Sequence, residues 1–258
     1  MNLMLEGQVA IVTGASAGIG RATAELLARE GAQVVAAARG PMEMDENRVE
    51  AVRVDLTEPA GPRQLVERAL ALHGRVDSVV NNVGGVVSHD GFLEIDDDSW
   101  AATLELNLLT AVRCSRAAIP ALLERGGSLV HVSSEAGRLP DPGILDYAAA
   151  KAGLRILSKG LAREFGSRGV RSNVVAPGPT RTRLWDEPGG FVDQLAARFE
   201  LEREAAVLHF VRDVRGLVTG RLGTPEEVAR VIAMLVSPLS AQVTGAEWTI
   251  DGGVLREV

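Results

Sequence analysis

Tyr147 is the only tyrosine of the chain, and Lys151 follows it by four residues within the sequence DYAAAKAG. On a helix this spacing places both side chains on one face. A phenol has a pKa of about 10, and a nearby ammonium group favours the phenolate and lowers that value. A drop of about three pKa units needs about 4 kcal/mol, to which Lys151, partial burial and a bound cation would contribute. We therefore expect Tyr147 to exchange a proton with a carbonyl or alcohol oxygen; the alternative is a surface aromatic beside a solvated lysine.

A glycine-rich stretch, TGASAGIG at residues 13–20, is the second pattern that indicates chemistry. It follows an apolar run at residues 9–13 and opens a predicted helix at residues 19–30. Its three glycines would let the backbone approach a pyrophosphate, and the helix N-terminus would face the phosphates. Many strand–helix turns use glycine only for packing, but the place of this turn directly after an apolar strand favours a dinucleotide site.

The residue after the second predicted strand would read the adenosine ribose of such a dinucleotide. Here the strand is followed by Arg39, and no carboxylate appears before Glu43. A guanidinium can pair with a 2′-phosphate, which favours NADP(H) over NAD(H). Arg39 could also stack on adenine or lie in solvent, so NAD(H) stays possible. Asp55, after the third strand, could bind the adenine amino group or serve as a turn residue.

The elements that must position these residues alternate between short apolar runs and longer helical patterns. Strand–helix–strand repetition predicts an α/β fold: one Rossmann-type, doubly wound domain with a seven-stranded parallel sheet and helices on both faces. We expect this domain to span residues 1–258. The predicted strands cover residues 9–13, 33–38, 49–55, 78–82, 127–134, 170–176 and 247–251.

The stretch of residues 183–222 interrupts this alternation and should hold two short helices. An insertion of this length indicates a substrate-binding segment or lid, although a surface flap is the alternative. Its apolar side chains, together with three from residues 140–144, would line a pocket for a cyclic or medium-sized ketone. The side chains assigned to this pocket are Leu184, Trp185, Phe191, Phe199, Leu208, Phe210, Pro140, Pro142 and Ile144.

Several motifs together resemble the short-chain dehydrogenase/reductase family over essentially the whole chain. They are TGASAGIG at residues 13–20, NNVG at 81–84, Asn107 in LELNLL, the serine pair at 133–134, YAAAK at 147–151 and PGPTRT at 177–182. The resemblance implies hydride transfer between a nicotinamide and a ketone or secondary alcohol. It also implies the catalytic set Asn107, Ser134, Tyr147 and Lys151.

Each catalytic role comes from this resemblance. The family separation of thirteen residues before Tyr147 selects Ser134, which would bind the substrate oxygen, whereas Ser133 would pack or form a turn. Asn107 lies in a predicted helix at residues 99–124. In the family this residue distorts the helix and connects a proton relay to the lysine, and the alternative is an Asn that bonds a neighbouring helix. Lys151 would also bind the nicotinamide ribose.

The expected cofactor-binding residues come from these motifs and from the ends of the second and third predicted strands. Val83 departs from the alanine that the family more often has, which the backbone contacts should tolerate. The residues are Gly14, Ser16, Gly18, Ile19, Gly20, Arg39, Asp55, Leu56, Asn82, Gly84, Tyr147, Lys151, Pro177, Gly178, Thr180 and Thr182.

Composition limits the remaining possibilities. The 258 residues are 46% hydrophobic with a net charge of −7, which argues against nucleic acid or an anionic membrane as a partner. The N-terminus shows no signal-peptide pattern, so we expect a cytoplasmic protein. The histidines and Cys114 lack metal-ligand spacing, so no metal is expected. The resemblance implies a homotetramer, with a dimer possible.

Two other classes of function remain open at this stage. A non-redox lyase or epimerase could use the same tyrosine as acid and base. A cofactor-sensing regulator could keep the fold without turnover, but it would be expected to lose members of the catalytic set.

Overall fold

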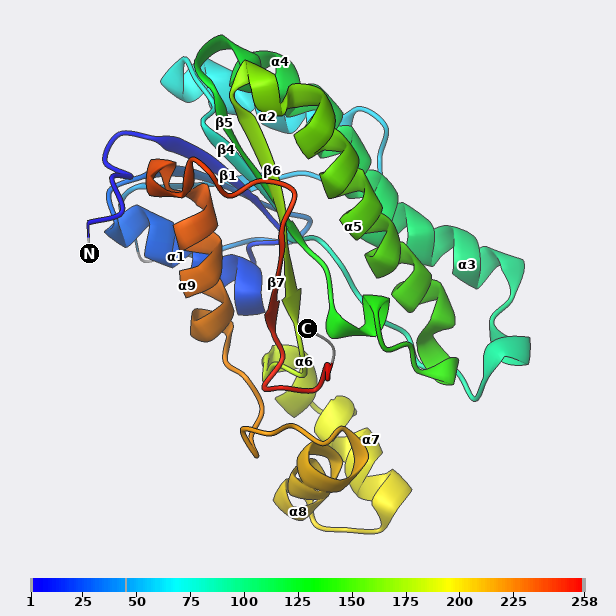
Figure 1. Cartoon of the computed structure of the whole chain (residues 1–258). Coiled ribbons are helices and arrows are strands. Elements are labelled where there is room, and N and C mark those ends of the chain that lie inside the picture. The colour runs from blue at the N-terminus through cyan, green and yellow to red at the C-terminus, as the bar shows by residue number, and fades with distance from the viewer. Residues whose placement is uncertain (1, 45, 257–258) are drawn as a thin grey trace.

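A computed structural model describes residues 2–44 and 46–256. Seven parallel strands form one sheet in the order β3-β2-β1-β4-β5-β6-β7 (Figure 1). This confirms the predicted fold class, and the strand ends differ from the prediction by at most two residues. The strands are β1 (Val9–Thr13), β2 (Gln33–Ala38), β3 (Val49–Arg53), β4 (Ser78–Asn81), β5 (Gly127–Val132), β6 (Val170–Pro177) and β7 (Glu247–Ile250).

Helices cover both faces of the sheet because side chains alternate along each strand. In β1, Val12 packs into the apolar core beneath α1 (Gly18–Arg29) and α9 (Pro225–Val236). The neighbouring Ile11 packs into the core beneath the second helix layer. Figure 1 shows the two layers on opposite sides of the sheet. The second layer is formed by α2 (Gly61–His73), α4 (Thr110–Arg125) and α5 (Leu145–Phe165).

The strand order reverses between β1 and β4, which is where doubly wound sheets open a crevice at their carboxyl ends. Both strands are followed by turns at this edge, the glycine-rich turn after β1 and the NNVG turn after β4. The fold therefore brings the two sequence motifs side by side.

The helix predicted at residues 99–124 is interrupted. It consists of α3 (Asp97–Leu104), a π-helical turn (Glu105–Leu109) and α4. Asn107 lies in the middle of this turn and donates from Nδ2 to the carbonyl oxygen of Thr103 at 3.1 Å. In an α-helix the backbone N–H of Asn107 would donate to this same carbonyl oxygen. Because the side-chain amide takes that acceptor, the helix changes locally from α to π.

The stretch from Asp97 to Arg125 is also long and apolar enough, by length and composition, to cross a membrane. Core helices of soluble proteins meet the same test. Here α4 packs on α2, and α3 packs on α5. We therefore describe it as a core element of the fold.

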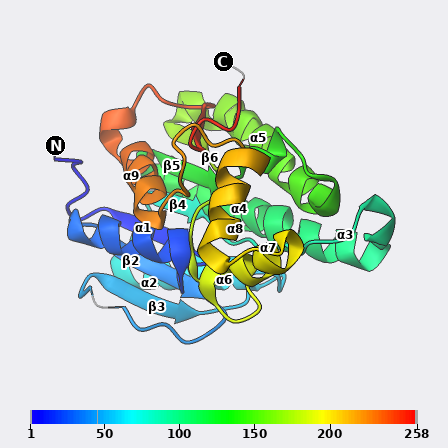
Figure 2. The same cartoon turned by 90° about the horizontal axis from the view of Figure 1, so that it is seen from below.

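The segment at residues 183–222 lies across the carboxyl ends of the strands (Figures 1 and 2). It contains the two predicted helices, α7 (Phe191–Phe199) and α8 (Arg203–His209), preceded by a short α6 (Arg183–Asp186) and followed by a π-helical turn (Phe210–Val214). The segment packs around a small apolar core of its own, so it is a folded unit and not an extended loop. That core comprises Val192, Val207, Val211, Leu217, Leu222 and Val254.

Candidate active site

A cleft of about 740 Å³ lies at the carboxyl edge of the sheet, beneath the segment at residues 183–222. All the predicted site residues line it except Gly20 and Asn107. Those that line it are Gly14, Ser16, Gly18, Ile19, Arg39, Asp55, Leu56, Asn82, Gly84, Ser134, Tyr147, Lys151, Pro177, Gly178, Thr180 and Thr182.

The glycine-rich turn has a shape that only glycine fits. Gly14 and Gly18 have φ angles of +67° and +56°, which disfavour any side chain. A Cβ atom at Gly20 would lie 2.3 Å from the carbonyl oxygen of Gly14, so Gly20 acts by close packing behind the cleft. Ala17 precedes α1 and has no polar side chain to cap it, so the first N–H groups of the helix remain available to a phosphate.

Asn82 connects the two motifs at the switch point. Its Nδ2 atom donates to the carbonyl oxygens of Thr13 at 3.0 Å and Gly14 at 3.1 Å. Its backbone N–H donates to the Thr13 hydroxyl at 2.9 Å. The side chain of Asn82 therefore fixes the shape of the glycine turn from the side.

The adenosine end of the cleft is lined by Arg39 and Asp55. The Arg39 side chain is exposed, and Arg53 on the edge strand donates to its carbonyl oxygen at 3.0 Å. The Oδ1 atom of Asp55 accepts from the backbone and hydroxyl of Thr57 at 2.9 and 2.7 Å. These bonds lower the pKa of the Asp55 carboxyl. They also show Asp55 as a turn residue, which was the alternative to adenine binding.

At the other end of the cleft lie Ser134, Tyr147 and Lys151. The Nζ atom of Lys151 lies 5.5 Å from the Tyr147 ring centroid and donates to the carbonyl oxygen of Val132 at 2.9 Å. Ser133 donates to the carbonyl oxygen of Lys151 at 2.8 Å, which confirms its packing role. Two hydroxyl groups thus line the same end of the cleft, and an amine lies beside the phenol.

The expected lowering of the Tyr147 pKa included a bound cation; in the protein without nucleotide, the pKa of Tyr147 is raised instead. Burial raises the pKa of Tyr147 to about 12; the nearby Ser134 hydroxyl opposes this, and the charge of Glu135 adds to it. Burial also lowers the pKa of Lys151 to about 8. Partial burial disfavours both charged forms, so it acts against the phenolate instead of contributing to it.

Asn107 lies behind the cleft, against the turn that follows β4. Its Oδ1 atom accepts from the Gly85 N–H at 3.1 Å, and its Nδ2 atom donates to the Gly85 carbonyl oxygen at 2.9 Å. A Cβ atom at Gly84 would lie 2.8 Å from the Asn107 Oδ1 atom and 3.0 Å from the Lys151 Nζ atom. Asn107 and Lys151 therefore approach each other across Gly84.

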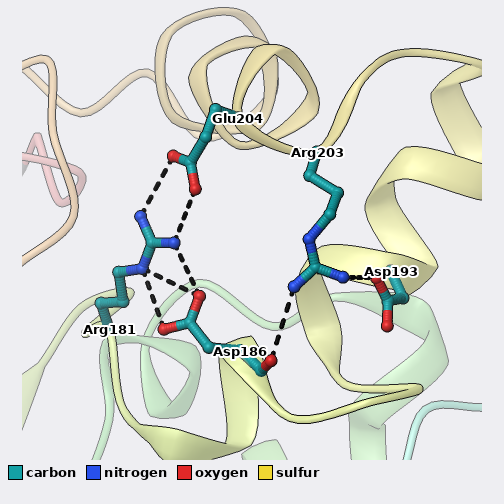
Figure 3. A network of polar contacts seen from close by, with 5 residues as sticks. All are labelled: Arg181, Asp186, Asp193, Arg203 and Glu204. Atoms are coloured by element: carbon teal, nitrogen blue, oxygen red, sulfur yellow. Dashed lines mark hydrogen bonds and ion pairs between the residues drawn. The ribbon is translucent and has the colours of Figure 1, made fainter.

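The turn after β6 lies opposite the glycine-rich turn. A Cβ atom at Gly18 would lie 3.1 Å from the Cγ2 atom of Thr182, and the Thr180 hydroxyl donates to the Gly178 carbonyl oxygen at 2.9 Å. Arg181 ties this turn to the segment below it, because it binds Asp186 of α6 and Glu204 of α8 (Figure 3).

An aromatic roof lines the substrate end of the cleft. It comprises Trp185, Phe191 and Phe210, with ring centroids 5.0 to 6.2 Å apart. Leu184 and Ile144 line the cleft beside these rings, as predicted.

Four of the apolar side chains assigned to this pocket lie elsewhere: Phe199, Leu208, Pro140 and Pro142. Phe199 stacks edge-on against His209 at 4.8 Å, on the outer side of α7 and α8. Pro140 lines a separate, smaller apolar hollow. Hydrophobicity alone does not distinguish the inner face of a short helix from its outer face.

Four charged residues of the cleft were missed: Glu135, Asp141, Arg183 and Arg215. The sequence held one signal, because Glu135 directly follows Ser134 at the end of a buried strand where ligands bind. Arg215 lies in the inserted segment, and no pattern connects it with Glu135, eighty residues earlier.

Two other titratable residues, Cys114 and His131, are structural. Burial raises the pKa of the Cys114 thiol to about 12, so the thiol is inert. His131 is fully buried in β5, between Asn81 and Ser172. Burial lowers its pKa to about 4, so it is neutral at pH 7.

Comparisons with known proteins agree with this arrangement. A family model described as enoyl-(acyl carrier protein) reductase matches residues 14–255. The chain is 36% identical to the 3-oxoacyl-[acyl-carrier-protein] reductase of Escherichia coli K12, covering 96% of this chain and 98% of that one. It is 34% identical to the enzyme of that name from Thermotoga maritima, covering 98% and 100%. The ligand-free aldohexose dehydrogenase of Thermoplasma acidophilum superposes with a TM-score of 0.87 at 25% identity, covering 98% and 96%.

Fold, motifs and relatives together define an oxidoreductase that transfers hydride between a nicotinamide dinucleotide and a ketone or secondary alcohol. The chain belongs to the short-chain dehydrogenase/reductase family. The predicted enzyme class is therefore confirmed, and nothing in these comparisons supports a lyase, an epimerase or a regulator.

Proposed function

We propose that this enzyme is an NADP(H)-preferring reductase of apolar ketones, with Tyr147 as the proton donor and Ser134 as the second hydrogen-bond donor to the substrate oxygen. The observation that carries this proposal is that Ser134 and Tyr147 line the same cleft, with the Lys151 Nζ atom 5.5 Å from the Tyr147 ring centroid. Two hydroxyl donors suit a carbonyl oxygen that becomes an alkoxide.

The protonation state of Tyr147 suits reduction. With a pKa raised to about 12 by burial, the phenol is protonated at neutral pH and ready to donate. Ser134 would orient the carbonyl oxygen, and Lys151 with Asn107 would return a proton to Tyr147 after each turnover. A bound reduced nicotinamide would supply the hydride.

The residues present fit a nicotinamide dinucleotide. Gly14 and Gly18 line the cleft with left-handed φ angles, so backbone without side chains faces it, and α1 begins at this turn. Lys151 would hold the nicotinamide ribose, and Thr180 and Thr182 the carboxamide. Arg39 is a cation at the adenosine end of the cleft, which supports NADP(H) over NAD(H).

We further propose that residues 183–222 form the substrate-binding insertion of a single domain spanning residues 1–258. The aromatic roof supports an apolar acyl chain or ring as substrate. The names of the bacterial relatives support a 3-oxoacyl group. We also propose a cytoplasmic enzyme that assembles as a homotetramer, with a dimer as the alternative.

The test is nicotinamide absorbance during incubation with ethyl acetoacetate, cyclohexanone and the matching alcohols, with NADPH and NADH compared. We expect NADPH consumption with a ketone, slower consumption of NADH, and loss of turnover in Y147F with retained NADPH binding. Conversion of substrate without any absorbance change would overturn the proposal in favour of a non-redox enzyme.

A further inference from the structure

A buried ion pair lies directly behind Ser134. The side chains of Glu135 and Arg215 are only 8% and 7% exposed, and the Glu135 Oε1 atom lies 2.5 Å from the Arg215 Nη2 atom. On its outer side, Arg215 Nη1 binds Asp141 Oδ2 at 2.6 Å. All three residues line the substrate end of the cleft. Charged pairs are seldom buried without a specific arrangement of partners.

Ser134 has a single hydroxyl proton, and the structure gives that proton to Glu135. Ser134 Oγ donates to Glu135 Oε2 at 2.8 Å and accepts from the Ala136 N–H at 3.1 Å. In this state Ser134 has no proton to offer a substrate oxygen.

Arg215 leaves one strong donor unused. Its Nε–H is fully buried, and no acceptor among the described residues lies within hydrogen-bond distance of it. Nε and Nη2 present parallel N–H groups that bind both oxygens of a carboxylate. Arg181 shows this mode in the same protein, with Nε and Nη2 both bound to Asp186 (Figure 3). At Arg215 only Nη2 holds Glu135, whose second carboxylate oxygen accepts from Ser134.

We propose that Glu135 and Arg215 form a two-position switch that controls the Ser134 proton. In the resting position, Glu135 accepts from Ser134 and Arg215 Nε is unpaired. In the engaged position, Glu135 turns its Oε2 atom onto Arg215 Nε, and the Ser134 hydroxyl donates to the substrate oxygen. No covalent bond changes and the proton stays on Ser134.

The exchange replaces one hydrogen bond to a carboxylate with another, so the two positions can lie close in free energy. Arg215 directly follows a π-helical turn. That turn begins at Phe210, which is one of the three rings of the aromatic roof and lines the cleft. A substrate that contacts Phe210 can therefore shift Arg215 and change which group the Glu135 carboxylate binds. Glu135 and Arg215 are positioning residues, since they act through Ser134.

This inference rests on the proposed reductase function, and kinetics with NADPH and ethyl acetoacetate give its first test. R215K keeps the cation but loses the paired N–H groups. We expect kcat to fall about tenfold, the value of one charge-assisted bond, with little change in KM. In an S134A background the same substitution should cost nothing further, because the switch has nothing left to release. Losses that multiply in the double variant would overturn the proposal.

R221K is the matched control, because it makes the same change at an arginine of the same segment that binds both carboxylate oxygens of Glu227, away from Ser134. We expect its kcat to stay within about twofold, since exposed ion pairs contribute little. An equal loss in R221K and R215K would mean that the stiffness of the segment alone sets the loss, which would also overturn the switch.

The second test needs neither substrate nor turnover. The ¹H–¹⁵N signal of Arg215 Nε is identified by its absence in R215K. In ligand-free S134A, Glu135 has lost its donor and should bind Nε, so this signal should move downfield and exchange more slowly with water. The shift should vanish in S134A/E135Q. An unchanged signal in S134A overturns the switch, whereas a wild-type enzyme that does not consume NADPH overturns only the reductase proposal.

Discussion

Replacing Gly84 with alanine tests whether Asn107 and Lys151 form one functional unit. A methyl group at this position would lie 2.8 Å from Asn107 Oδ1 and 3.0 Å from Lys151 Nζ. The backbone of Gly84 itself has no left-handed φ, so the substitution introduces contact and not backbone strain.

The expected loss follows from these distances. Ordinary contact begins near 3.4 Å, so Asn107 Oδ1 must retreat by about 0.6 Å. That oxygen accepts from the Gly85 N–H at 3.1 Å, and the retreat weakens this buried bond. A buried group without its partner costs about 1–3 kcal/mol, and a displacement of about 1 Å can cost about a hundredfold in rate. We expect G84A to lower kcat by ten- to a hundredfold and the free energy of unfolding by about 2 kcal/mol.

The assay is steady-state NADPH consumption with ethyl acetoacetate, alongside urea unfolding and NADPH binding. G85A is the control, because a Cβ atom there meets only a terminal methyl of Leu106 at 3.3 Å. We expect G85A to keep kcat within about threefold of wild type, since a leucine methyl can move aside. Equal kcat values for G84A and G85A would refute the reasoning, as would a G84A enzyme of wild-type activity.

Three further outcomes are expected. Ultraviolet titration of the nucleotide-free protein should show one phenol ionising near pH 12, and this signal should be absent in Y147F. Ionisation of the phenol at or below pH 10 would contradict the burial effect. Y147F should also lower kcat at least about a hundredfold. His131 binds a proton in the unfolded chain near pH 6.5 but in the folded protein only near 4, so its contribution to stability is complete above pH 6.5 and falls by about 3 kcal/mol by pH 4. Urea unfolding should show this loss in wild type and not in H131N, and equal pH slopes would argue against it. R39A should raise KM for NADPH about tenfold and leave KM for NADH unchanged, because only NADPH carries the 2′-phosphate; parallel changes would place Arg39 elsewhere.

The sheet was predictable because its signals are local. Apolar runs such as Val9–Thr13 are buried on both faces, and glycine-rich turns follow them. The run of apolar residues and the turn that ends it are therefore enough to locate such strands. The π-helical turn at Asn107 was predicted only as a distortion, through the family resemblance. Its form depends on a hydrogen bond from the side chain to Thr103, which the residue pattern of the helix does not reveal.

The site was predictable in its residues and not in its electrostatics. The spacing of Tyr147 and Lys151 placed both at the cleft, but the sign of the Tyr147 pKa shift depends on burial, which arises from the whole fold. The partners of Ser134 show the same limit. Glu135 is adjacent in sequence, whereas Arg215 reaches it only because the inserted segment folds back over the cleft.

The inserted segment packs on its own small core, which includes Val192, Val211 and Val254, while the catalytic helix packs on the sheet. Two separate sets of contacts therefore support recognition and chemistry. Substitutions in the core of the inserted segment can change which substrates bind without disturbing Tyr147 and Lys151. A chimera that exchanges this cassette between relatives should change the substrate range and keep the reaction, provided that the partner of Glu135 travels with it.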